Sequence, residues 1–264
     1  MPDAILRVEN LRKEFGSFVA VDDVSFTVPE GGSLAVVGES GSGKTTIAKM
    51  ITGLERPTAG TITTCGHDRS TPARSARKRR ERGKQVQIVF QDPYTSLDPR
   101  HSAMEAIDEV LRIHHQWPAS RRRARAEELT ELVGLDRRQA TVAPRSLSGG
   151  QRQRVAIARA LAAEPRIMIL DESVAALDVS IQAQVLNLLA DIRLQTGVAY
   201  VLISHDLAVV RQLTEQCIVL RSGRIVEHGP TAVVLDDPQD DYTRLLRASV
   251  PRPGWRPQRR PLRG

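Results

Sequence analysis

SLAVVGESGSGKT, residues 33–45, is the stretch of sequence that decides the fold. It begins with the apolar run of a buried β-strand, and residues 38–45 then fit the pattern G-x-x-x-x-G-K-[ST]. The glycines let the backbone turn its N–H groups inward, which makes a nest for anionic oxygens. Residues 45–53 have helical character, so a helix dipole would point at the same place. The stretch therefore predicts a strand, loop and helix of an α/β fold that holds a phosphate group.

Two side chains of this loop have defined expected roles. Lys44 is placed to reach the β- and γ-phosphates of a nucleotide, and the Thr45 hydroxyl is placed to ligate Mg²⁺. An ordinary glycine-rich turn between a strand and a helix is the alternative, and the strand before the loop with the helix after it argues against that alternative. The residues predicted to bind ATP in this stretch are Gly38, Ser40, Gly41, Ser42, Gly43, Lys44, Thr45 and Thr46.

The second element of the expected site is the apolar run at residues 167–170, which ends in Asp171 and Glu172. A strand that ends in Asp places a carboxylate at the carboxyl edge of the sheet, where ligands bind in open α/β folds. Asp171 would hold Mg²⁺ directly or through water, while Glu172 points elsewhere and can polarise an attacking water. Many buried strands end in Asp, so this pattern alone is weak evidence. It becomes informative because the glycine-rich loop precedes it in the chain.

The third element is the pentapeptide LSGGQ at residues 147–151, which opens a helix. Ser148 is a good N-cap, and taken alone the paired glycines fit a simple turn equally well. A second glycine-rich helix start is, however, also a second anion site. One nucleotide does not need two such sites from one chain, whereas two chains packed head to tail would use both.

Length and composition bound the class of protein. A chain of 264 residues suffices for one large α/β domain with a smaller inserted subdomain. The formal net charge is +7, and the basic residues concentrate at residues 74–82, residues 121–125 and the tail after residue 251. Such runs fit nucleic acid or anionic lipid, but solvated helix faces and a disordered tail are the favoured interpretation.

Cysteine content and hydropathy restrict the setting of the chain. Cys65 and Cys217 are far apart and lack His or Cys neighbours at metal spacing, so we expect no disulfide framework or zinc site and a reducing compartment. The N-terminus has charges where a signal peptide needs an apolar run. Because no stretch of about 18 apolar residues occurs, we expect a partner to hold the chain at any membrane where it works.

Local patterns place the expected elements along the chain. Strands are expected at residues 5–9, 24–28, 33–37, 61–63, 86–90, 167–170, 199–203, 217–220 and 224–227. Helices are expected at residues 45–53, 103–115, 121–133, from 148 onward, 179–194 and about 239–248. The helical stretch at about 92–150 is interpreted as an inserted subdomain, and residues 251–264 as a disordered basic tail rich in Pro and Arg.

The order of the motifs carries a specific resemblance. From the N-terminus they are the loop at 38–45, Gln91 after a strand, LSGGQ, the pair Asp171–Glu172, Asp178 and His205. Together they resemble the ATP-binding subunit of an ABC transporter over nearly the whole chain. The resemblance implies an α/β P-loop NTPase fold over residues 1–250. It also implies an N-terminal antiparallel β subdomain and the inserted helical subdomain.

The resemblance also implies a site shared by two subunits. ATP would lie between the loop of one chain and the LSGGQ of the other, with Ser148 and Gly150 at the partner's γ-phosphate. Gln91 would sense Mg²⁺ and the water, Asp178 would cross the dimer interface, and His205 would hydrogen-bond the γ-phosphate and position the water.

Phe15 occupies the place of the aromatic residue that stacks on adenine, and a plain core role for Phe15 or Phe18 is the alternative. A lone histidine such as His205 is more often structural, but its place after an apolar strand, in Ser-His-Asp, favours function.

The implied roles complete the predicted site. The catalytic residues are Lys44, Gln91, Glu172 and His205. The Mg²⁺ residues are Thr45, Gln91 and Asp171. The ATP contacts outside the loop are Phe15, Ser148, Gly149, Gly150, Gln151 and Asp178.

Four segments indicate a subfamily. Residues 37–43, 90–99, 177–184 and 238–253 resemble bacterial oligopeptide, dipeptide and nickel importers. The form Phe-Gln-Asp-Pro-Tyr at residues 90–94 resembles the second of the two paired ATPase subunits of such importers. The resemblance implies an ATPase that energises uptake of peptides or a related solute, nickel included, through a permease at the cytoplasmic face of the membrane. It implies a second ATPase subunit, related or identical, and an extracellular solute-binding protein acting indirectly. No nucleic-acid partner is expected.

The sequence departs from the family pattern at three positions. Ser173 stands where Pro is usual, Asp98 where Asn is usual, and Ser146 where Glu is common. Ser173 frees a backbone N–H and loosens a turn beside Glu172, so we expect it to tune the rate. Some relatives carry an iron–sulfur cluster near the C-terminus, but Cys217 is the one cysteine in that region, so no cluster is expected.

Two other functions stay open at this point. A non-transport ABC ATPase acting on DNA or ribosomes would explain the basic runs. The chain has neither the coiled-coil inserts of DNA-repair relatives nor the two cassettes of translation factors. A regulatory module that binds nucleotide without turnover is the second alternative, and the intact Glu172 and His205 argue against it.

Overall fold

The computed structural model describes residues 4–92, 96–174 and 177–248, and its centre is a mixed β-sheet. The sheet has six strands in the described part of the chain. In spatial order they are β10 (Arg224–Pro230), β9 (Gln216–Arg221), β3 (Ser33–Val37), β8 (Ala199–Ser204), β7 (Ile167–Asp171) and β6 (Val86–Val89). All neighbours pair in parallel except β10 and β9. Every residue of β3, β7 and β8 is buried, as expected of central parallel strands covered on both faces.

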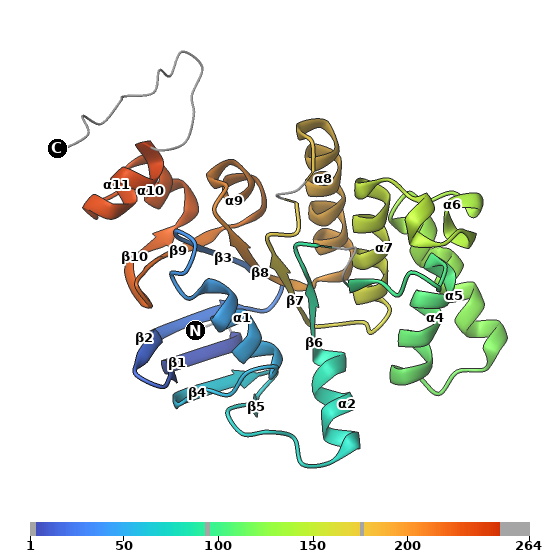
Figure 1. Cartoon of the computed structure of the whole chain (residues 1–264), viewed down its shortest axis with the longest axis horizontal. Coiled ribbons are helices and arrows are strands. Elements are labelled where there is room, and N and C mark those ends of the chain that lie inside the picture. Colours follow the sequence, from blue (N-terminus) through green and yellow to red (C-terminus); the bar gives the residue numbers. More distant parts are fainter. Residues whose placement is uncertain (1–3, 93–95, 175–176, 249–264) are drawn as a thin grey trace.

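A second, antiparallel sheet is built from the N-terminal part of the chain (Figure 1). Its order is β2 (Phe18–Pro29), β1 (Ala4–Phe15), β4 (Ala59–Thr64) and β5 (His67–Asp68). Helix α1 (Lys44–Thr52) buries Ile47, Met50 and Ile51 in the apolar cluster that joins this sheet to the central one. The antiparallel subdomain expected at the N-terminus is therefore present, and it supports the helix that follows the glycine-rich loop.

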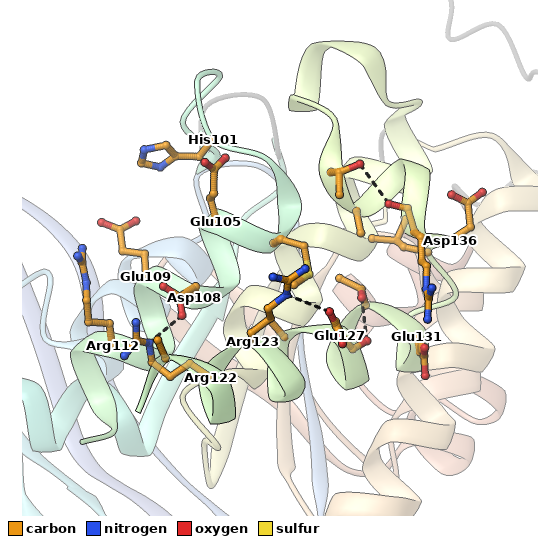
Figure 2. A pocket seen from close by; sticks show the side chains of 18 residues that line it. His101, Glu105, Asp108, Glu109, Arg112, Arg122, Arg123, Glu127, Glu131 and Asp136 are labelled. Carbon is orange, nitrogen blue, oxygen red and sulfur yellow. Dashed lines mark hydrogen bonds and ion pairs between the residues drawn. The ribbon is translucent and has the colours of Figure 1, made fainter. Parts of the chain in front are cut away.

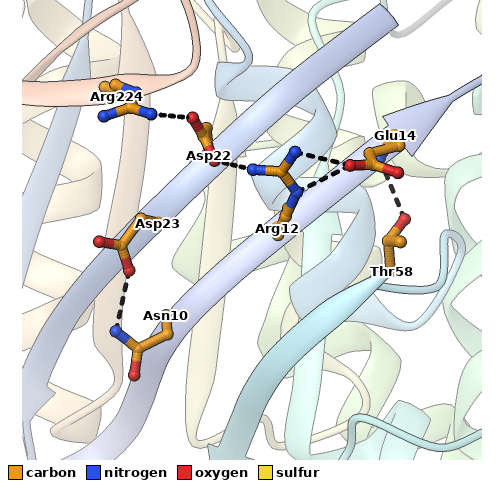
Figure 3. Close-up of polar contacts among 7 residues, drawn as sticks. All are labelled: Asn10, Arg12, Glu14, Asp22, Asp23, Thr58 and Arg224. Carbon is orange, nitrogen blue, oxygen red and sulfur yellow. Dashed lines mark hydrogen bonds and ion pairs between the residues drawn. The ribbon is translucent and has the colours of Figure 1, made fainter. Parts of the chain in front are cut away.

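The hairpin of β1 and β2 is longer than the sequence patterns predicted, and the cause is a pair of irregular positions. Asn10 and Asp23 have positive φ angles of 48° and 56°, and the pairing register shifts between Val8 and Leu11. The Asn10 side-chain amide donates to the Asp23 carboxylate at 2.8 Å (Figure 3). These bulges interrupt the alternation of apolar residues, which shortened the predicted strands.

A charged network ties this hairpin to the central sheet (Figure 3). Asp22 of β2 forms ion pairs with Arg12 of β1 and with Arg224 of β10. Arg12 also donates to Glu14 at 2.8 Å, and the Glu14 N–H donates to the Thr58 hydroxyl at 3.0 Å. The network fixes the end of β1, where Phe15 lies.

Helices gather beyond the β6 edge of the central sheet (Figure 1). They are α4 (Ala103–His114), α5 (Ala119–Leu132), α6 (Arg137–Thr141), the short 3₁₀ helix η1 (Pro144–Ser146) and α7 (Gly149–Leu161). Helix α4 starts with a capping box between Ser102 and Glu105. The buried residues Ile107, Leu111 and Leu129 join these helices to the larger apolar cluster. The predicted helices at 103–115 and 121–133 correspond to α4 and α5.

Further helices in the described part of the chain are α2 (Ala76–Gln85), α8 (Val179–Thr196), α9 (Leu207–Leu213), α10 (Thr231–Asp236) and α11 (Asp241–Ala248). No residue of α2 is buried, so the basic run there is a solvated helix face, as favoured from the sequence. In α5, Arg123 and Arg125 form ion pairs with Glu127 and Glu128. Helices α6, α9 and α10 were not predicted, because elements of five to seven residues give too little periodicity.

The structure also describes the cysteines and the apolar character of the helices. Cys65 and Cys217 are both free thiols. Within the described ranges, none of the helices has the length and apolar character that a bilayer span requires. Residues 93–95 of the subfamily segment 90–99, the end of the segment 238–253 and the basic tail lie outside the described residues.

Candidate active site

The glycine-rich loop at residues 38–43 leaves the end of β3 and enters α1, as predicted. Gly38, Gly41 and Gly43 have φ angles of 153°, 80° and 107°, in the region that favours glycine. A Cβ atom on Gly43 would lie 2.4 Å from the Ala20 carbonyl oxygen. The loop therefore depends on glycine both for its turn and for its close approach to β2.

Lys44 reaches back over the loop that precedes it. Its Nζ atom donates to the carbonyl oxygens of Gly38 at 2.8 Å and Glu39 at 2.7 Å. The side chain is buried, which lowers the pKa of Lys44, and the charges of Glu172 and Asp171 oppose that shift. The ammonium group therefore lies within electrostatic reach of both carboxylates at the end of β7.

Asp171 ends β7 with its carboxylate buried beside the start of α1. The residue is 7% exposed, and burial and then the charge of Glu172 raise its pKa. The charges of Lys44 and Lys49 and a hydrogen bond with Thr45 oppose this shift. A hydroxyl and a carboxylate side by side are hard oxygen donors of the kind that Mg²⁺ prefers. The residues present thus fit the divalent cation expected at Thr45 and Asp171.

Glu172 and His205 meet at the ends of adjacent parallel strands. The Glu172 N–H donates to the Ile203 carbonyl of β8 at 2.9 Å, and Glu172 has a φ angle of 47°. Its carboxylate lies 3.2 Å from His205 Nδ1. The Glu172 side chain is 22% exposed and that of His205 is 60% exposed. A partly shielded carboxylate held by an imidazole is suited to accept a proton from water.

The residues after His205 connect this pair to α8. Asp206 caps α9, since its Oδ1 accepts hydrogen bonds from the Ala208 and Val209 N–H groups. Its other oxygen accepts from the Gln182 amide of α8 at 3.3 Å. Asp178 caps α8 by accepting from the Ile181 N–H at 3.0 Å, and this bond lowers its pKa.

The LSGGQ stretch forms the start of α7 through a capping box. The Ser148 hydroxyl accepts from the Gln151 N–H at 3.3 Å, and the Gln151 side chain accepts from the Ser148 N–H at 2.8 Å. A Cβ on Gly150 would lie 2.4 Å from Ile181 of α8, so Gly150 is needed for helix packing. In the described part of the chain no hydrogen bond or ion pair joins Ser148 or Gln151 to the loop.

Two further predicted site residues, Phe15 and Gln91, are exposed. Phe15 is 47% exposed and Phe18 is 61% exposed, so the alternative that either has a core role is wrong. The Lys13 ammonium lies 4.6 Å from the centroid of the Phe15 ring. Gln91 is exposed in the segment that follows β6.

The three departures from the family pattern have different surroundings. Asp98 accepts hydrogen bonds from Arg100, which holds its pKa well below the usual range. Ser146 is exposed. Ser173 is 3% exposed, and among the described residues its hydroxyl has no hydrogen-bond partner. Ser173, whose backbone N–H was predicted to be freed, therefore also has a buried hydroxyl without a partner among the described residues.

Sequence reasoning missed a side chain of α11 that touches the loop. The hydroxyl of Tyr242 in α11 accepts a hydrogen bond from the Glu39 N–H at 3.0 Å. The two residues are 203 positions apart, so no local pattern links them. The second missed contact is that of Gln182 with Asp206.

Comparison with known proteins identifies the family. Residues 21–175 match the family model described as "ABC transporter". The chain belongs to this family. ABC transporter ATPases bind and hydrolyse ATP, and this chain is an ATP-binding, ATP-hydrolysing subunit of that kind.

Two relatives show how far the similarity extends. The chain is 45% identical over 260 residues to a Brucella abortus protein whose name describes a peptide import ATP-binding protein, covering 95% of this chain and 78% of the relative. It is 43% identical over 233 residues to the oligopeptide transport ATP-binding protein OppF of Lactococcus lactis, covering 88% and 72%.

Two solved structures have the same fold. One is the dimeric ATP-binding cassette MJ0796 in a post-hydrolysis state with ADP and Pi, with a TM-score of 0.77 and 30% identity over 86% of this chain and 98% of that one. The other is cbiO1 from Clostridium perfringens, part of an ABC transporter complex, with a TM-score of 0.80 and 26% identity over 89% and 92%. The expected P-loop NTPase cassette is therefore confirmed.

Proposed function

We propose that this ABC ATPase energises a bacterial importer for peptides or a related solute such as nickel. The observation that carries the catalytic part is the contact of Glu172 with His205 at the strand ends. The names of the Brucella and Lactococcus relatives support peptides as the solute class. The chain would work at the cytoplasmic face of the membrane, held there by a permease.

The proposed chemistry assigns each polar group near the loop a task. Glu172 accepts the proton of the attacking water, and His205 orients that carboxylate and contacts the γ-phosphate. Lys44 exchanges its bonds to the loop carbonyls for the β- and γ-phosphates, since an ammonium prefers anionic oxygens. Mg²⁺ held by Thr45 and Asp171, with Gln91 near it, would neutralise charge on the phosphates.

The proposed working unit is a head-to-tail dimer. Ser148 is exposed at the positive end of a 13-residue helix, which suits an anion supplied by another chain. Val179, next to Asp178, is 82% exposed, which favours a partner surface at this position. Gly149, Gly150 and Gln151 would accompany Ser148 at the partner's nucleotide. The mate would be a related chain or an identical one.

A groove in the helical part supports docking of a permease segment (Figure 2). It has a volume of about 930 Å³ and lies among α4, α5 and α6. Met104, Ala126 and Leu135 line it together with charged residues of both signs, such as Glu105 and Arg123. An amphipathic helix with apolar and charged positions would complement this lining. Gln91 is not part of this lining.

The experiment that tests this function has two arms. The purified chain should release phosphate from ATP, and the chain isolated from membranes should carry a permease and a second ATPase subunit. An extracellular solute-binding protein would bind the same permease. Phosphate release without any membrane partner would instead favour a non-transport ABC ATPase. The exposed basic helix α2 is the observation behind that candidate, and RNase-sensitive material in the preparation would support it.

A further inference from the structure

We propose that Tyr242 is a positioning residue for the phosphate-binding loop and makes ATP affinity depend on the C-terminal helix α11. The inference rests on the proposed role of residues 38–45 in holding the phosphates. Tyr242 is not one of the catalytic residues proposed above, and it lies far from the loop in the sequence. Its hydroxyl acts through the backbone of the loop and need not touch the nucleotide.

The contact itself is specific. The Glu39 N–H donates to the Tyr242 hydroxyl at 3.0 Å, and Glu39 is the second residue of the loop. Tyr242 is only 5% exposed, and its ring belongs to the larger apolar cluster together with Val234 and Leu235. The guanidinium of Arg221, at the end of β9, lies 4.9 Å from the ring centroid. The hydroxyl is therefore presented to the loop from a fixed ring.

Lys44 and Tyr242 form hydrogen bonds with the carbonyl and the N–H of the same loop residue, Glu39. The Glu39 carbonyl accepts from Lys44 Nζ at 2.7 Å, while the Glu39 N–H donates to Tyr242. Glycines flank this part of the loop at Gly38 and Gly41, so its backbone has wide conformational freedom. If Lys44 turns to a phosphate, the Tyr242 bond remains as an anchor. An anchor of this kind lowers the entropy that the loop loses when it binds an anion.

Helix α11 is itself well secured, which gives the anchor a defined position. Glu227 of β10 accepts hydrogen bonds from the Gln239 N–H at 2.8 Å and the Asp240 N–H at 3.2 Å. The Asp240 carboxylate in turn accepts from the Tyr242 N–H at 2.8 Å. Arg247 donates to the Asp236 carbonyl of α10 at 2.7 Å. Two strands and a neighbouring helix thus set the place of the hydroxyl.

Tyr242→Phe tests the inference, because it keeps the buried ring and removes only the hydroxyl. We expect the Kd for ATP to rise roughly three- to tenfold, the size of one lost hydrogen bond. The kcat at saturating ATP should stay within about twofold of wild type, because Glu172 and His205 are untouched. ATP binding by calorimetry and phosphate release give the two values.

Tyr200→Phe is the matched control. Tyr200 is fully buried in β8, and its hydroxyl donates to the Leu189 carbonyl at 2.8 Å, remote in sequence from the loop. This variant should lower the thermal midpoint without changing the Kd for ATP. An unchanged Kd in Tyr242→Phe would overturn the inference. Equal affinity losses in both variants, in step with their stability losses, would overturn it too, since they would mark a purely structural role.

A third variant separates this inference from the proposed role of the loop. Lys44→Ala should abolish detectable ATP binding if residues 38–45 hold the phosphates. Wild-type affinity in Lys44→Ala would refute that role and this inference together. Loss of binding in Lys44→Ala with an unchanged Kd in Tyr242→Phe would refute this inference alone.

Discussion

The Nδ1 atom of His205 lies 3.2 Å from the carboxylate of Glu172, at the carboxyl ends of the neighbouring parallel strands β8 and β7. The register of these strands pairs Asp171 with Ile203, so Glu172, one residue after Asp171, and His205, two residues after Ile203, leave the same edge of the sheet. The bond from the Glu172 N–H to the Ile203 carbonyl fixes the same junction. The strand pairing, and not only the side-chain conformations, therefore holds Glu172 and His205 close to each other.

Glu172→Gln is expected to bind ATP with near-normal affinity and to hydrolyse it about 10²–10³-fold more slowly, because the amide cannot accept the proton of the water. Phosphate release and equilibrium ATP binding measure the two effects. Glu128→Gln, an exposed change on α5, should leave both values unaltered. Near-normal hydrolysis by Glu172→Gln would remove Glu172 from the role of base.

His205→Ala is expected to slow hydrolysis by about 10²-fold, since Glu172 loses the ring that orients it. The double variant with Glu172→Gln should be little slower than the slower single variant, because residues that act as a unit are not additive. A fully multiplicative loss in the double variant would show that the two residues act independently, against the observed contact.

The sequence predicts this site well where chemistry depends on local pattern. Glycines at 38, 41 and 43, and the apolar strands before Glu172 and His205, indicated both the backbone shape and the sheet edge. The Tyr242–Glu39 bond escaped prediction because it joins residues 203 positions apart. The length of β1 and β2 escaped because the bulges at Asn10 and Asp23 break the period of two that marks a strand. Short helices such as α9 were not predicted, because α9 is marked by its cap at Asp206 more than by any apolar periodicity.

Phe15→Ala is expected to raise the Kd for ATP roughly tenfold, and Phe15→Trp to retain wild-type affinity, because stacking on a base is worth about 1–3 kcal/mol and needs only an aromatic face. Phe18→Ala is the matched control, since Phe18 is the exposed neighbour of Phe15 across the same hairpin. Titration with ATP measures all three. Equal, small effects of both alanine variants would exclude adenine stacking at Phe15.

Asp171→Asn is expected to stabilise the nucleotide-free chain at pH 7, while hydrolysis falls at least about 10²-fold. Burial raises the pKa of Asp171 in the folded chain. Its contribution to stability is therefore present below the unfolded pKa of about 4 and is lost as pH rises through the folded pKa. The advantage of the variant should shrink on acidification.

Chemical unfolding at several pH values measures the difference in stability between Asp171→Asn and the wild type. Asp191→Asn, an exposed change on α8, is the control and should leave stability unchanged. A destabilised Asp171→Asn chain at pH 7 would contradict the expectation, because it would mean that the lysine charges and the Thr45 hydrogen bond outweigh the cost of burial.

Mixing two inactive variants tests the proposed head-to-tail dimer of identical chains. Lys44→Ala disables the loop, and Ser148→Arg disables the helix start that would face the partner's nucleotide. A mixed dimer then keeps one site built from two intact halves. If chains exchange at random, the mixture should recover about a quarter of wild-type phosphate release, while each variant alone stays inactive.

Ser148→Arg also removes an N-cap, which costs about 1 kcal/mol of stability, so it needs a control with the same local loss. Ser102→Arg provides one, because Ser102 forms the same kind of capping box at the start of α4. That variant should hydrolyse ATP at the wild-type rate despite a similar drop in the thermal midpoint. Full activity of Ser148→Arg alone would contradict a shared site. Failure of the mixture to recover, with both variants folded, would instead indicate that the mate of this chain is a related second subunit, since two copies of the chain would then not complete each other's sites.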